Sequence, residues 1–282
     1  MKKSGRGADE TRIAAALERI ARVLEGGAPI AADFDGAQCW RWEERGGLYP
    51  LPVPPDELSL LCGVEEQIAL VECNTLAFLR GRPANHALLT GPRGTGKSSV
   101  IRGVFAKYAG RGLRLIETDA AGLCGLPKLF SAFAARREKF IVYCDDLSFH
   151  GDTLLFQKFK SALDGGIAAA GNNLRVYATS NRRHLTAEFF ADNERTADGE
   201  IHGAETIEEK TALSDRFGLW APFFDMARPE YEAAAARWLA FYGVRPNAKL
   251  AQRAHRWADE RGSMNGRMAR HFAVAAANKT EK

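Results

Sequence analysis

The chain has no long apolar run. Its charged opening, MKKSGRGADETR, is followed by a stretch that Glu18, Arg19 and Arg22 interrupt. This pattern predicts neither a signal peptide nor a membrane span, and we expect a cytoplasmic protein with no membrane partner. The five cysteines are few, odd in number and without CxxC spacing. They argue against a disulfide framework and a cysteine zinc site, and they indicate a reducing compartment.

Strong net charge, internal repeats and low-complexity segments are also missing. Lys and Arg number 39 against 35 Asp and Glu, which gives a formal net charge of +4. Such a mild excess does not require a nucleic-acid partner, because dedicated DNA-binding proteins concentrate positive charge more sharply. With 282 residues, 46% of them hydrophobic and 26% charged, the chain is long enough for one large or two medium globular domains.

Residues 1–55 are expected to form an N-terminal helix and an extended arm. Apolar residues recur at helical spacing over 9–25. From 28 to 55 the chain is rich in Gly and Pro, which predicts irregular structure. Trp40 and Trp42 could stack on nucleic-acid bases. We favour the alternative, in which these tryptophans pin the arm to the domain.

The next region, residues 56–227, alternates short apolar runs with amphipathic stretches. This pattern predicts a parallel sheet covered by helices on both faces. The expected strands are 86–90, 113–118, 139–146, 174–180 and 219–225, and the expected helices are 97–108, 127–137 and 153–164. Over residues 228–282 the strand pattern stops, and three helical periods predict a small C-terminal helical domain.

A glycine-rich segment with the pattern GxxxxGKS lies between the first strand and its helix. Its backbone N–H groups and the helix N-terminus suit phosphates, so the segment predicts a P-loop. Lys97 is expected to reach the β and γ phosphates of ATP, and Ser98 to hold Mg²⁺. A glycine turn with a purely structural role would not explain the flanking strand and helix. The candidate nucleotide-binding residues here are Gly91, Pro92, Arg93, Gly94, Thr95, Gly96, Lys97, Ser98 and Ser99.

Polar residues end two further apolar strands. Asp145 and Asp146 follow FIVYC, and Asn181 follows VYATS. Ligands bind at the carboxyl ends of parallel strands, so we expect Asp145 to organise Mg²⁺, Asp146 to deprotonate water and Asn181 to hold that water. Many ATPases use a glutamate as the base; the shorter Asp146 would act at longer reach or through a better-placed water. Considered singly, the aspartates would be a solvent-facing pair and Asn181 a turn residue.

The chain resembles the AAA+ ATPase superfamily in six segments: LLCGVEEQ, NTLAFLRG, GPRGTGKSS, CDDLSF, YATSNRRHL and EEKTALSDRFGLW. More narrowly, it resembles an uncharacterised bacterial AAA+ family catalogued as domain of unknown function 815, over roughly residues 40 to 275. The resemblance implies a P-loop α/β fold with five parallel strands in the order 5-1-4-3-2 and a C-terminal helical lid. Residues 56–227 would then be the nucleotide-binding domain and 228–282 the lid.

The same resemblance gives a role to Arg216, in SDRFG. It implies that this arginine points at the ATP of an adjacent subunit, in a homo-oligomer such as a hexamer. A guanidinium placed there would stabilise the negative charge on the transferred phosphoryl group. The alternative is a salt bridge within the chain, to Asp215 or Glu209.

The resemblance also implies contacts at the other end of ATP. It places the lid sensor at Arg267, with Arg270 as the alternative, and the base pocket near Gly63 and Val64. ATP would then bridge the sheet domain and the lid, and hydrolysis would loosen the lid.

Three polar regions suggest further sites but are better explained as surface. His202 and nearby carboxylates in 185–211 lack regular ligand spacing, so a solvated loop is favoured over a metal site. The basic patches at 182–184 and 135–139 are too short to indicate nucleic-acid binding.

Three functions compete on the sequence alone. The first is an oligomeric ATPase that remodels or loads a protein or nucleic-acid client. Threading of peptides is disfavoured because residues 118–129, where unfolding relatives carry an aromatic pore loop, contain no aromatic side chain. The second is a nucleotide-gated binding module with little turnover. The third is a P-loop kinase, which would not need Asn181, Arg216 and a helical lid together.

Overall fold

The structure is a computed structural model that describes residues 36–43, 47–148, 153–164, 173–181 and 216–280. Its centre is a seven-stranded sheet in the order β2-β1-β4-β5-β6-β3-β7. All neighbouring strands are parallel except the β1–β2 pair. The strands are β1 (Cys39–Glu43), β2 (Gly47–Leu51), β3 (Ala87–Thr90), β4 (Leu113–Thr118), β5 (Lys139–Cys144), β6 (Leu174–Ser180) and β7 (Leu219–Pro222).

The expected fold class is confirmed. The five predicted strands lie in the order β7-β3-β6-β5-β4, which is 5-1-4-3-2 when they are numbered along the chain. The difference lies at the edge, where β1 and β2 extend the sheet beyond β4. The prediction of irregular structure over 28–55 was therefore wrong for these two strands. Short runs rich in Gly and Pro gave no strand signal, and β1 depends on pairing with a distant strand.

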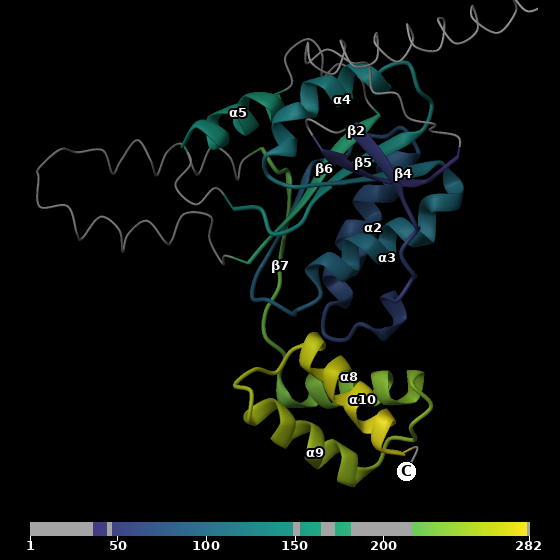
Figure 1. Ribbon diagram of the computed structural model, residues 1–282, viewed down its shortest axis with the longest axis vertical. Coiled ribbons are helices and arrows are strands. Elements are labelled where there is room, and N and C mark those ends of the chain that lie inside the picture. Colours follow the sequence, from purple (N-terminus) through teal and green to yellow (C-terminus); the bar gives the residue numbers. More distant parts are fainter. Residues whose placement is uncertain (1–35, 44–46, 149–152, 165–172, 182–215, 281–282) are drawn as a thin grey trace, which may run out of the picture.

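Helices cover both faces of the sheet (Figure 1). One face packs against α2 (Glu65–Leu79) and α3 (Lys97–Tyr108), the other against α4 (Leu126–Phe133) and α5 (Thr153–Asp164). Successive strand residues point to opposite faces of the sheet. Ile141 therefore packs in a first apolar cluster, under α2 and α3, and Val142 in a second apolar cluster, under α4 and α5. Short 3₁₀ turns complete this domain: η1 (Leu58–Leu60), η2 (Ala109–Arg111) and η3 (Gly122–Gly125).

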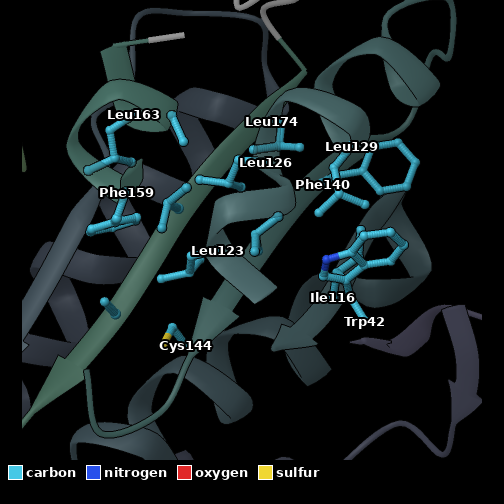
Figure 2. Close-up of a cluster of buried hydrophobic side chains, with 14 of the residues drawn as sticks. Trp42, Ile116, Leu123, Leu126, Leu129, Phe140, Cys144, Phe159, Leu163 and Leu174 are labelled. Carbon is cyan, nitrogen blue, oxygen red and sulfur yellow. The ribbon is translucent and has the colours of Figure 1, made fainter. Parts of the chain in front are cut away.

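The second apolar cluster contains both tryptophans of β1 (Figure 2 shows Trp42). Trp40 and Trp42 are 1% and 4% exposed, and the indole Nε1 of Trp42 donates to the Gly122 carbonyl at 3.1 Å. A Cβ on Gly125 would lie 2.9 Å from that nitrogen, so the indole requires a glycine there. The tryptophans therefore anchor the strand to the core, and stacking on bases is excluded by their burial.

Three helices form the lid beyond the carboxyl end of the sheet (Figure 1). They are α8 (Arg228–Phe241), α9 (Ala248–Asp259) and α10 (Gly266–Thr280), and they enclose a third apolar cluster around Tyr231, Trp238 and Phe272. Alanines supply much of that cluster, which lets the helices approach closely. Among the described residues, no helix has the length and apolar character that a membrane span requires. The expected helix over 9–25 lies outside the described residues.

Candidate nucleotide site

The glycine-rich segment forms a tight loop between β3 and α3. Gly91, Gly94 and Gly96 have φ angles of +139°, +83° and +105°, a region that side chains rarely allow. A Cβ on Gly91 would also lie 2.2 Å from the carbonyl oxygen of Phe223. Only glycine fits at this position, because β7 ends against the start of the loop.

Lys97 begins α3 and turns its side chain back into the loop. The Nζ donates to the carbonyls of Gly91 and Pro92, at 2.7 and 2.8 Å, and to the Asn181 Oδ1 at 3.0 Å. The residue is only 5% exposed. This burial lowers the pKa of Lys97 to about 8, although Asp145 and Asp146 act in the opposite direction. The ammonium is thus held by three oxygen atoms, two from the loop backbone and one from the Asn181 amide.

Asp145 lies directly after β5, within reach of α3 and β6. Its Oδ1 accepts hydrogen bonds from the Ser98 and Thr179 hydroxyls, both at 2.7 Å. Burial alone would raise the pKa of this carboxyl, but the hydrogen bonds from Thr179 and Ser98 outweigh it and hold that pKa below its usual value. The carboxylate is therefore ionised at neutral pH.

The Ser98 hydroxyl and the Asp145 carboxylate fit magnesium. Mg²⁺ binds proteins through one or two oxygen side chains and keeps the rest of its shell for water and phosphate. No group of three or more His, Cys, Asp or Glu side chains suited to a metal ion occurs in the described part of the chain. A Mg²⁺ held by these two residues would need phosphate oxygens as well.

Asp146 has a left-handed backbone, with φ of +55°, and no other described non-glycine residue has a positive φ. Its N–H donates to the Thr179 Oγ1 at 2.9 Å, and its Oδ1 accepts from the Asn181 Nδ2 at 2.6 Å. Its Oδ2 lies 3.5 Å from the Arg93 guanidinium. Asn181 therefore bridges Asp146 and Lys97, one with each end of its amide.

These groups line a cavity of about 530 Å³ between the carboxyl edge of the sheet and the lid. The volume is in the usual range for small-ligand sites. From the lid, Arg267 and Arg270 reach the cavity, and Arg267 is close enough to lower the pKa of Lys97 after the larger effect of burial. The predicted residues that line the cavity are Val64, Arg93, Gly94, Thr95, Gly96, Lys97, Ser98, Ser99, Asp145, Asp146, Asn181 and Arg267.

The apolar end of the cavity lies between η1, the start of α2 and α8. Cys62, Val64, Met226 and Trp238 line it. Gly63, named with Val64 from the sequence, is not among the lining residues; a Cβ there would lie 3.2 Å from the Glu230 carboxyl. Gly91 and Pro92 also do not line the cavity, but their carbonyls hold Lys97.

Arg216 lies near the amino-terminal ends of the parallel strands, opposite the carboxyl ends that border the cavity. It comes just before β7, whose first residue, Leu219, pairs with Ala87 at the start of β3. The P-loop follows the other end of β3, so the length of that strand, about 13 Å, separates the two. Phe217 is buried beside Arg216 in the core, and Arg216 does not line the cavity of its own chain.

Apart from the apolar lining residues, two polar residues that hold the site together were not predicted. Thr179 joins both aspartates, and its hydroxyl inside an apolar run is the signal that could have drawn attention to it. Asn265 caps α10 through its Oδ1 and donates its Nδ2 to the Arg93 carbonyl at 3.2 Å. The asparagine before a helical period marks a cap, but its contact with the P-loop depends on tertiary structure.

Two of the surface regions lie outside the described residues, namely the basic patch at 182–184 and the loop containing His202. In the patch at 135–139, Arg136 pairs with Glu138 at 3.2 Å, and Lys139 begins β5. Arg136 is therefore paired within the chain, and Lys139 is part of the sheet.

Comparison with known proteins shows the fold. The structure is similar to the Orc1 protein of Aeropyrum pernix in complex with DNA, with a TM-score of 0.56 and 16% identity over 80% of this chain and 62% of that one. It is similar to a mutant of Thermotoga maritima RuvB, with a TM-score of 0.51 and 17% identity over 78% and 64%. It is also similar to replication initiator DnaA bound to AMPPCP and single-stranded DNA. The TM-score there is 0.50, and the identity is 11% over 76% of this chain and 60% of that one.

The chain thus spans less than two thirds of the length of each of these proteins. At such low identity the likeness concerns the fold alone, which is the AAA+ fold. The comparison with curated proteins finds no match. A family model matches residues 35–280, nearly the whole of the sheet domain and lid. The chain therefore belongs to the family described as "Protein of unknown function (DUF815)", and it has the AAA+ fold.

Proposed function

We propose that the protein is an oligomeric ATPase that uses ATP hydrolysis to remodel or load a protein or nucleic-acid client. One observation carries the proposal. A single cavity brings together the P-loop, the carboxylates of Asp145 and Asp146, the Asn181 amide and Arg267 of the lid. Phosphoryl transfer needs these kinds of group: cations for the phosphates, a carboxylate for the metal, and a polar group for the attacking water.

The residues divide this work by position. Lys97 would bind the terminal phosphates, and Ser98 with Asp145 would hold Mg²⁺, whose charge would offset that of the phosphates. Asn181 orients the attacking water, and Asp146 accepts its proton. These two are hydrogen-bonded already at 2.6 Å, so water placed by one is within reach of the other.

Arg216 completes the site of a neighbouring subunit. It lies near the amino-terminal ends of the strands, and the cavity of its own chain lies at their carboxyl ends and does not include it. An arginine supplied by another subunit makes hydrolysis depend on assembly, and its guanidinium stabilises charge in the transition state. The buried Phe217 beside it fixes the backbone at that point.

Mixing of subunits tests this assignment. We expect Arg216→Ala to lower ATP turnover by about 10³-fold or more. Lys97→Ala should also be inactive, and the two inactive proteins should recover partial activity when combined, because a mixed assembly contains some intact sites. Arg82→Ala is the matched control, since Arg82 is exposed near the same edge of the sheet. If both variants assemble and no activity returns, Arg216 does not act between subunits.

Threading of a peptide is disfavoured as the way in which the client is handled. Residues 118–129 contain no aromatic residue. Leu123 and Leu126, at the centre of this stretch, are fully buried in the same apolar cluster as Trp42 (Figure 2). A stretch packed in this way presents no apolar loop to a translocating chain.

A second function, a nucleotide-gated assembly module, is favoured by one feature. The short carboxylate of Asp146 is already engaged by Asn181 and lies near Arg93, so it is less free to act as a base. Light scattering with ATP, ADP and no nucleotide, together with a phosphate-release assay, separates the two. Assembly on ATP without phosphate release would replace the ATPase by the module.

A further inference from the structure

We propose that the outer surface of the lid binds the phosphate backbone of a nucleic acid. The surface is a groove between the turn after α8, the helix α9 and the end of α10, and we call it the lid groove. Its five basic side chains are Arg245, Lys249, Arg253, Arg256 and Lys279. The inference rests on the proposed function only in making this nucleic acid the client of the ATPase; the groove itself shares no residue with the nucleotide cavity.

The lid groove is a concave surface and carries charge of one sign. It encloses about 670 Å³, and none of the described residues that line it is acidic. All five basic side chains are exposed. Figure 1 shows α9 on the side of the lid away from the sheet, so the sheet domain does not cover it.

Charge in the lid is strongly unbalanced. Residues 228–282 contain eleven Lys and Arg against five Asp and Glu, a net +6, whereas the whole chain carries +4. Other lid arginines have carboxylate partners: Arg228 with Asp259, Arg261 with Glu260, and Arg270 with Glu57.

In the described part of the chain, no ion pair involves the five basic residues of the lid groove. Like charges at helical spacing repel, so this cluster adds nothing to the stability of the lid. Its charge is complementary to an external polyanion.

The spacing and chemistry of the cluster favour phosphates over carboxylates. Lys249, Arg253 and Arg256 lie on one face of α9, four and three residues apart. They span about 10 Å along the helix axis, which equals the axial length of about three nucleotides of one DNA strand. Three of the five groups are arginines, whose planar forks match phosphate oxygens. Asn247 and Gln252 add amide donors to the same groove.

Oligonucleotide binding to the full chain tests the proposal. The probes are a fluorescent oligodeoxythymidylate and a fluorescent duplex, followed by anisotropy at several salt concentrations without added nucleotide. We expect Arg253→Ala/Arg256→Ala to weaken binding by about tenfold or more, and to reduce the slope of log affinity against log salt by about 1.4 for the single strand. The matched control, Lys128→Ala/Arg137→Ala, removes the same charge from exposed positions near α4 and should change affinity less than about twofold.

Three outcomes would overturn the proposal. One is equal loss in the groove variant and the control, which means non-specific attraction. The second is displacement of the oligonucleotide by polyglutamate at equal charge, which assigns the groove to an acidic protein. The third is tighter binding to anionic vesicles than to either oligonucleotide. If the groove variant melts at a lower temperature, Arg245→Ala/Lys279→Ala replaces it. Because no ATP is present, a negative result leaves the ATPase proposal intact, and an inactive ATPase leaves this one intact.

Discussion

The two walls of the nucleotide cavity are built differently. On the sheet side, Lys97, Asp145 and Asn181 belong to one continuous set of hydrogen bonds, and Lys97 is almost fully buried. On the lid side, Arg267 and Arg270 are exposed. The lid touches the P-loop through two hydrogen bonds, from the Asn265 amide to the Arg93 carbonyl and from the Arg267 N–H to the Gly94 carbonyl, both at 3.2 Å.

Under the proposed function, this difference would separate two tasks. The sheet wall holds its polar groups in place before nucleotide arrives, which favours transition-state stabilisation. Among the described residues, the lid wall is joined to the P-loop by these two bonds alone and is otherwise held at η1, where Arg237 donates to the Ser59 and Leu61 carbonyls, so a nucleotide that bridges both walls would add a direct link between the lid and the P-loop. Variants of the sheet wall should therefore abolish chemistry, and variants of the lid wall should weaken coupling between the two.

Of the changes to the two walls, Lys97→Met in the sheet wall is expected to have the largest effect. Removing this ammonium should lower ATP turnover by about 10³-fold, because no other described lysine or arginine is buried and able to replace it. The thermal midpoint should stay level or rise, since a buried charge is replaced by an apolar side chain of similar length. Lys107→Met on the exposed face of the same helix is the control. Turnover above a tenth of wild type would show that the sheet wall does not bind the phosphates.

A smaller loss is expected from Arg267→Ala in the lid wall. We expect turnover to fall by about 10²-fold, because one cation that faces the phosphates is lost. Stability should be unchanged, as the side chain is exposed. Arg228→Ala, an exposed lid arginine outside the cavity, should behave as wild type in both assays. Full turnover in Arg267→Ala would transfer the role to Arg270.

The sheet wall was more predictable from the sequence than the lid wall for a physical reason. Lys97, Asp145 and Asn181 each end or follow an apolar strand, and parallel strands bring their carboxyl ends to one edge. Local pattern alone therefore indicated which residues would meet. Arg267 was placed by family resemblance, because a helical period does not show which face of a lid turns towards the sheet.

Contacts between distant segments were beyond local pattern. Trp42 gave no strand signal, because β1 depends on pairing with β4 far along the chain and on a glycine in η3 that leaves room for the indole. Asn265 could be recognised as a cap, but its second bond to Arg93 could not. In the same way, the lid groove joins residues from a turn and two helices, so it is not visible as a charge run.

A change in pH should distinguish the walls without mutation. Burial lowers the pKa of Lys97 to about 8, so this side chain loses its proton as the pH rises from 7 to 9. The terminal phosphate of the ligand does not cause this change, because its last ionisation, with a pKa of about 6, is nearly complete at pH 7. We therefore expect ATP affinity to fall by about tenfold from pH 7 to pH 9, measured by titration with a fluorescent analogue. Lys97→Met should bind weakly at both values, and a parallel fall in that variant would place the titrating group elsewhere.

The smallest effect is expected at the bond between the walls, and Asn265 allows its two roles to be separated. Asn265→Ser keeps a cap for α10, so stability should change by only a few tenths of a kcal/mol, but serine is too short to reach the Arg93 carbonyl. Asn265→Ala loses the cap as well and should cost about 1 kcal/mol. If the P-loop bond positions the lid, both variants should lose the same few-fold nucleotide affinity, although only the alanine variant melts at a lower temperature. An affinity that follows the melting temperature would instead make the helix cap responsible, and the bond from the Arg267 N–H to the Gly94 carbonyl would then be the contact that matters between the lid and the P-loop.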